Sequence, residues 1–103
     1  MQTQATIDEM DLTVRSTYCL KRAGITTFGE LCALLDESAD LMRVRYMGLK
    51  STAEVLRKAK EMGYPSDEAV ARHIEELKRT PEINPNRIQF WEGLHESLKS
   101  AQE

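Results

Sequence analysis

The sequence predicts an all-α protein, a compact bundle of four short helices followed by two further helices at the C-terminus. Apolar residues recur at the spacing of one helix face in several windows, whereas runs that alternate with a period of two are rare. The β-branched residues are scattered, so no segment stands out as a strand. A length of 103 residues, 41% of them hydrophobic, suffices for one core and is too short for two.

The first two helices are expected to form a pair joined by a glycine turn. Thr13 is a favourable N-cap for a helix over residues 14–23, and Gly24 follows as the glycine that ends it. A second helix is expected over residues 27–35. The first helix has a candidate buried stripe of Val14, Thr17 and Leu20 or Cys19. The second has a single apolar face of Phe28, Leu31, Cys32 and Leu35.

The third and fourth helices repeat this arrangement. Ser38 is expected to cap a short helix that stops before Gly48. The next helix is expected from residue 49 or 50 to residue 62, with Gly63 ending it. The short helix carries Leu41, Met42 and Val44, and the longer one has an inward stripe of Val55, Leu56, Ala59 and Met62.

Two more helices are expected in the last forty residues or so. Ser66 is a candidate cap for a helix over residues 67–79, whose apolar stripe is thin. Two prolines, Pro81 and Pro85, then forbid a continuous helix. The last helix, over residues 87–100, is amphipathic and needs a surface to cover its apolar side.

Residues 64–103 are expected to form a helical extension. The extension carries two adjacent aromatic residues, Phe90 and Trp91. Three interpretations stay open: the last helix completes the protein's own core, its aromatic residues form an interface with a partner or a second copy, or the acidic extension covers a basic face.

The net charge of −3 is unevenly distributed along the sequence. Residues 14–60 carry nine basic and five acidic side chains, whereas residues 61–103 carry five basic and nine acidic ones. Residues 1–13 carry three acidic side chains and no basic one. The overall balance argues against a uniformly basic nucleic-acid binder, and any anion-binding site is expected in the middle segment. The alternative is that these charges form ordinary solvated faces.

An enzyme is not expected, because the sequence lacks a pattern of catalytic or metal-ligating residues. His73 and His95 are far apart in the sequence and are expected to be exposed helix residues. Cys19 and Cys32 lack metal-ligand spacing and are expected to be small core residues. No cofactor or metal is implied. The sequence has no apolar run of membrane-spanning length and no signal-peptide pattern, so we expect a cytoplasmic protein.

Two segments, residues 20–31 and 42–56, are each predicted to form a helix, a glycine-containing turn and a second helix. This repeated unit is the first feature that indicates a function. Backbone N–H groups at the start of such a second helix point outward and favour a phosphate. In the second unit, Gly48 allows close approach, and Lys50 and Ser51 add a cation and a hydroxyl. This turn lacks the earlier glycine and the preceding strand of a nucleotide-binding P-loop.

The strings IDEMDLTVRSTYCLKRAGITTFGEL, from residue 7, and RVRYMGLKSTAE, from residue 43, resemble the C-terminal domain of the bacterial RNA polymerase alpha subunit. The resemblance covers residues 7–63, so it implies a domain at residues 1–63 that is followed by the helical extension at residues 64–103. It implies a four-helix fold with two helix-hairpin-helix-like units that binds the minor groove of AT-rich double-stranded DNA. It also implies RNA polymerase, a sigma factor or a transcription activator as partners, with the protein itself a monomer or weak dimer.

The resemblance assigns roles to particular residues. In that family an arginine at the position of Arg15 enters the DNA minor groove, and the residues at Gly48, Lys50 and Ser51 contact phosphate. Glu54 matches the family's acidic position. A carboxylate does not bind phosphate, so Glu54 is expected to orient Arg15 or Lys50, to face a partner protein, or to be a plain exposed charge.

The sequence departs from the family where DNA contact is expected. Tyr18 and Tyr46 stand where the family has asparagine. Each tyrosine could contact a phosphate or a deoxyribose, or pack against neighbouring helices. A short lengthening at residues 33–37 is expected to lie in a loop. The leading hypothesis is a noncatalytic DNA-binding transcription module, and the alternative is a protein-interaction adaptor that has lost DNA binding.

Overall fold

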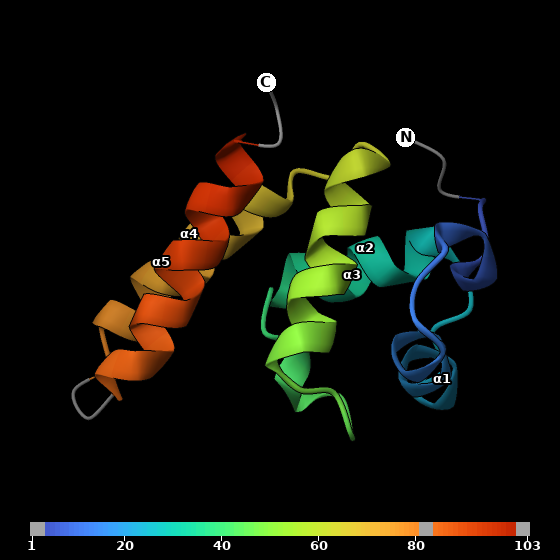
Figure 1. Cartoon of the computed structure of the whole chain (residues 1–103), viewed down its shortest axis with the longest axis horizontal. Helices are drawn as coiled ribbons and strands as arrows, with labels where there is room; N and C mark the ends of the chain where they lie inside the picture. The colour runs from blue at the N-terminus through green and yellow to red at the C-terminus, as the bar shows by residue number, and fades with distance from the viewer. Residues whose placement is uncertain (1–3, 81–83, 101–103) are drawn as a thin grey trace.

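The computed structural model describes residues 4–80 and 84–100, and within these ranges every regular element is a helix (Figure 1). The all-α prediction is therefore confirmed. Two short 3-10 helices accompany five α-helices. In sequence order they are η1 (Ile7–Met10), α1 (Val14–Arg22), α2 (Phe28–Glu37), η2 (Leu41–Arg43), α3 (Leu49–Glu61), α4 (Ser66–Lys78) and α5 (Pro85–Ser100).

The first helical pair has the predicted ends. The Thr13 hydroxyl accepts a hydrogen bond from the Ser16 N–H and caps α1, while Gly24 follows α1 with a left-handed φ of 87°. Thr27 and Glu30 form a capping box at the start of α2. This helix continues to Glu37, past its expected end. The lengthened segment at residues 33–37 is thus helical, which corrects the loop prediction.

Two predicted caps are wrong. Asp40, and not Ser38, caps η2, because its carboxylate accepts a hydrogen bond from the Met42 N–H at 3.0 Å. The Ser38 hydroxyl instead accepts from the Asp40 N–H. Ser66 is the first residue of α4 and is buried, so Pro65 takes the N-cap position without a side-chain hydrogen bond. Both serines stand close to a helix start, where sequence alone does not fix the boundary.

The core combines residues from η1, η2 and all five α-helices. Cys19 and Cys32 are buried, as predicted for small core residues. Val14 is 87% exposed, which corrects the predicted stripe, since the buried face of α1 follows the spacing of Ser16, Cys19 and Leu20. The largest fully buried side chains include Ile7, Leu20, Phe28, Leu31, Leu35, Leu41, Leu56, Trp91 and Leu98.

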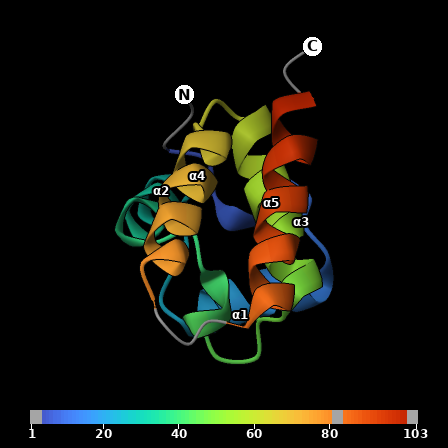
Figure 2. The same cartoon turned by 90° about the vertical axis from the view of Figure 1, so that its left-hand side faces the viewer.

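The helices α4 and α5 form an antiparallel hairpin that lies along α3, on the side away from α1 (Figures 1 and 2). Trp91 is fully buried and packs edge-on against His73 of α4, with ring centroids 4.6 Å apart. Of the three interpretations of the last helix, the structure therefore supports completion of the protein's own core. Phe90 is half-buried beside Trp91. Trp91 is not available as a partner anchor, because its indole exposes no surface.

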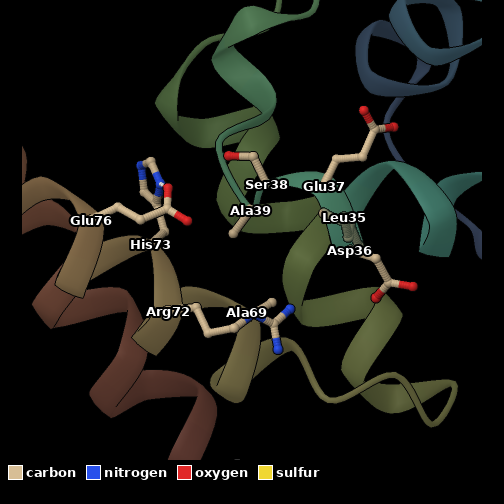
Figure 3. A pocket seen from close by; sticks show the side chains of 9 residues that line it. All are labelled: Leu35, Asp36, Glu37, Ser38, Ala39, Ala69, Arg72, His73 and Glu76. Atoms are coloured by element: carbon tan, nitrogen blue, oxygen red, sulfur yellow. Dashed lines mark ion pairs between the residues drawn. The ribbon is translucent and has the colours of Figure 1, made fainter.

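His73 is buried, whereas the sequence predicted an exposed helix residue. It follows Val70 by three residues and precedes Leu77 by four, so it completes the thin apolar face of α4. Figure 3 shows its imidazole beside the Glu76 carboxylate and facing the segment that carries Ser38. The cavity there is small, about 30 Å³. His95 is half-buried.

The remaining expectations about the extension have mixed outcomes. Pro85 is the first residue of α5, a position that suits proline because the first helical N–H needs no partner within the helix. Pro81 lies outside the described residues. No helix in the described ranges is long and apolar enough to cross a membrane.

Candidate nucleic-acid interface

A surface groove lies where the N-terminal ends of α1 and α3 meet. It is lined by Thr13, Arg15, Gly48, Leu49, Lys50, Ser51 and Glu54. Five of the seven residues predicted to form the DNA site therefore line one groove, although Arg15 is separated from the others by more than thirty residues of sequence. The tertiary fold brings together the arginine and the glycine turn that the sequence marks separately.

Glu54 of α3 is hydrogen-bonded to the start of α1. Its carboxylate accepts hydrogen bonds from the Thr13 N–H at 2.9 Å, the Thr13 hydroxyl at 2.9 Å and the Ser16 hydroxyl at 2.5 Å. Partial burial acts to raise the pKa of Glu54, but these hydrogen bonds and the charge of Lys58 outweigh it and lower the pKa. Glu54 thus holds the helix that carries Arg15, and it makes no direct bond to Arg15 or Lys50.

Arg15 is the second residue of α1 and its side chain is exposed. Its Nη2 donates a hydrogen bond to the backbone oxygen of Tyr46 at 3.3 Å, which links α1 to the turn before α3. Among the described residues, no carboxylate lies within ion-pair distance of this guanidinium. No described residue therefore neutralises the positive charge at the edge of the groove.

The start of α3 is uncapped. Gly48 is its N-cap, with φ of −104° and no side chain to bond the N–H groups of the first turn. A Cβ added at Gly48 would meet nothing within 4 Å, so packing inside the protein does not require glycine there. Lys50 is exposed beside this opening, and Ser51 is 8% exposed while still lining the groove. Free N–H groups, a cation and open space suit an anionic ligand.

Tyr18 and Tyr46, the other two residues predicted for the DNA site, do not line the groove and are 55% and 56% exposed. The guanidinium of Arg22 lies 5.6 Å from the Tyr18 ring centroid and donates to its hydroxyl at 3.0 Å. Arg45 lies 5.0 Å from the Tyr46 ring centroid. Both rings therefore pack on arginines at the surface, and neither is buried between helices.

The backbone of Tyr46 is left-handed, with φ of 69°. Glycine and asparagine adopt this conformation readily, whereas a residue with a bulky side group does so at a cost of roughly 1–2 kcal/mol. The departure from asparagine at this position therefore places an aromatic ring where the local backbone disfavours it.

The family model for the C-terminal domain of the bacterial RNA polymerase alpha subunit matches residues 1–61, which is more than half of the sequence. The protein belongs to this family. A DNA-directed RNA polymerase subunit alpha from Alkaliphilus oremlandii is 52% identical over 68 residues, covering 63% of this protein and 21% of the relative. The same subunit from Carboxydothermus hydrogenoformans is 53% identical over 57 residues, covering 55% of this protein and 18% of the relative.

The protein spans about a fifth of the length of the curated relatives it matches. The Alkaliphilus metalliredigens subunit is likewise 52% identical over 68 residues and covers the same shares. No solved structure matches the protein significantly. Among residues 4–80 and 84–100, no group of histidine, cysteine and carboxylate side chains is placed to hold a metal ion.

Sequence reasoning missed four residues in or next to the site. Thr13 and Ser16 form the hydrogen bonds with Glu54. The N-cap signal in the sequence singled out Thr13, the first of these two residues. Val14, which precedes Arg15, and Leu49, which lines the groove with it, add exposed apolar surface. Each is the first residue of its helix, where the inward stripe has not yet begun, and this position could have indicated their exposure.

Proposed function

We propose that this protein is a noncatalytic DNA-binding transcription module that holds AT-rich DNA across the groove between α1 and α3. One observation carries the proposal: the guanidinium of Arg15, which has no carboxylate partner among the described residues, and the uncapped start of α3 open onto the same groove. Family membership supports it, because the matched relatives are subunits of a DNA-directed polymerase.

Arg15 is the proposed contact with the minor groove. A narrow AT-rich minor groove concentrates negative potential and attracts an arginine without requiring a base-specific hydrogen bond. The hydrogen bond to the Tyr46 carbonyl is long and exposed, so DNA can replace it at little cost. The bonds between Glu54 and the start of α1 keep Arg15 directed at the groove.

The start of α3 is the proposed phosphate contact. A phosphate placed above Gly48 would accept hydrogen bonds from the first N–H groups of α3 and lie close to the ammonium group of Lys50. Ser51 lines the same groove and adds a hydroxyl. These contacts fix the position of the duplex and carry little sequence information.

The acidic extension leaves this groove open. None of the described residues 64–80 and 84–100 lines it. Arg57, Gly63, Pro65 and Ser97 line a separate depression between the C-terminal end of α3 and the extension. The division at residue 63 is therefore proposed as one between a DNA-binding part and a hairpin that buries the outer side of α3.

The adaptor function is the second candidate. The exposed apolar residues Val14 and Leu49 favour it, because apolar side chains beside a groove are common in protein interfaces. RNA polymerase, a sigma factor or an activator would be the partner. An adaptor would capture polymerase equally well after Arg15→Ala, whereas a DNA-dependent association would be lost.

Fluorescence anisotropy of the full-length protein with labelled AT-rich and GC-rich duplexes tests the leading proposal. The AT-rich duplex should bind more tightly, and its affinity should fall steeply as salt rises. Arg15→Ala should weaken binding about tenfold or more. Arg79→Ala, at an exposed arginine at the end of α4, should bind like the parent protein. A DNA affinity that does not depend on the salt concentration, or that Arg15→Ala does not lower, would contradict the proposal.

A further inference from the structure

The exposed apolar surface of this protein is gathered around Arg15. Among the residues that the structure describes, the large hydrophobic side chains on the surface are those of Val14, Tyr18, Tyr46 and Leu49. Val14 precedes Arg15, and Tyr18 follows it by one helical turn. Leu49 lines the groove together with Arg15. The backbone oxygen of Tyr46 accepts the hydrogen bond that the Arg15 guanidinium donates. We call this surface the tyrosine face.

The two rings of the tyrosine face are held in place by arginines. Arg22 both packs on the Tyr18 ring and donates to its hydroxyl, and Arg45 packs on the Tyr46 ring. More than half of each tyrosine nevertheless stays exposed. A ring that is already ordered loses less conformational entropy when a planar ligand stacks on it.

The strained backbone at Tyr46 points to a ligand outside the protein. Its left-handed φ of 69° would suit asparagine or glycine better. The fold gains little in return, because the ring is not buried in the core. A disfavoured residue whose ring serves little purpose inside the protein is a reason to look for an external contact.

The charges around the tyrosine face are mostly positive, which favours a nucleic acid as the external ligand. A second depression is lined by Cys19, Arg22, Ala23, Val44, Arg45 and Tyr46, and the hydrogen bond from Arg15 to the Tyr46 backbone oxygen links a residue of the first depression to one of the second. The residues that line the two depressions include four cations, Arg15, Arg22, Arg45 and Lys50. Glu54 is the one acid among them, and its carboxylate is occupied by the start of α1.

We propose that the tyrosine face binds single-stranded DNA, with Tyr18 and Tyr46 stacking on unpaired bases while Arg15, Lys50 and the start of α3 hold the phosphates. Aromatic rings set among cations are the general means of binding single strands. In a duplex the base faces are covered by their neighbours, so exposed rings reach only sugars and phosphates. The inference rests on the proposed function, because both use the same phosphate contacts.

The test compares an oligothymidylate with an AT-rich duplex, each labelled and titrated with the full-length protein by fluorescence anisotropy. Tyr46→Asn removes the ring and suits the left-handed backbone, so it should fold at least as well as the parent protein in thermal unfolding followed by circular dichroism. It should weaken single-strand binding about tenfold, the effect of losing one stacked base, and weaken duplex binding by a clearly smaller factor, because the ring does not stack on the bases of a duplex. Tyr46→Phe, which keeps the ring, is the matched control and should bind both like the parent protein.

The outcomes separate the two proposals. Equal weakening of single-strand and duplex binding by Tyr46→Asn would overturn stacking and leave the duplex proposal standing. Binding of the single strand alone would overturn the duplex proposal. If neither DNA binds, both proposals fall. If sedimentation shows a dimer of the parent protein that Tyr46→Asn dissociates, the tyrosine face is a contact between copies and the inference is overturned.

Discussion

The starts of α1 and α3 meet at one groove but are built in opposite ways. The start of α1 is capped by Thr13 and held by three hydrogen bonds to Glu54. The start of α3 has only Gly48 at its cap position and no side-chain bond. A helix end that serves structure has its N–H groups and hydroxyls satisfied by the protein, whereas one that serves binding leaves them for the ligand.

The largest effect on stability is expected from Glu54→Ala. This change removes every acceptor that fastens α1 to α3, and hydrogen bonds to a charged group are worth more than neutral ones. The free energy of unfolding should fall by about 2 kcal/mol, measured by urea denaturation. DNA affinity should fall as well, because Arg15 loses its support. An unchanged unfolding midpoint would show that the start of α1 does not depend on Glu54.

A smaller effect on the free energy of unfolding is expected from lowering the pH. This change removes the negative charge of Glu54 and leaves its side chain in place. The pKa of Glu54 is lowered in the folded protein, so its stabilising effect is full above its unfolded pKa of about 4.3 and is lost as the pH falls through the lowered value. The difference in unfolding free energy between the parent protein and Glu54→Gln should therefore shrink below about pH 4.3. A difference that stays constant across this range would mean that the carboxylate charge is not used.

The smallest effect on stability, with a larger one on binding, is expected from Gly48→Ser. The added hydroxymethyl group meets open space and can cap α3, so stability should rise by a few tenths of a kcal/mol, about the difference between serine and glycine caps. The same hydroxyl would occupy the proposed phosphate position and lower the affinity for duplex DNA. Gly48→Ala, which adds bulk without a cap, is the control. Unchanged DNA affinity in both variants would show that the start of α3 does not bind phosphate.

Much of the fold was predictable because helix ends carry local signals. Thr13, Gly24 and Thr27 mark their helices through side-chain capping and a left-handed turn, which depend on a few neighbouring residues. The errors at Ser38 and Ser66 arose where a nearby residue competes for the same cap position. Such competition is decided by small energy differences that a single sequence does not reveal.

The errors at buried residues have another cause. Periodicity shows which residues share a helix face, but it does not show which face the rest of the protein covers. His73 is buried because Trp91 of α5 packs on it, and Val14 is exposed because no described element crosses the start of α1 on that side. The choice between core and interface for Trp91 likewise depended on how the α4 and α5 hairpin docks on α3.

The sequence by itself determined the helical class, most helix ends, the family and the residue types of the candidate site, since these depend on local spacing and short strings. The tertiary structure decided which residues meet: Glu54 with the start of α1, Arg15 with the turn at Tyr46, and Trp91 with His73. Each of these pairs joins segments far apart in the sequence, and their contact follows from the packing of whole helices, which no local pattern encodes.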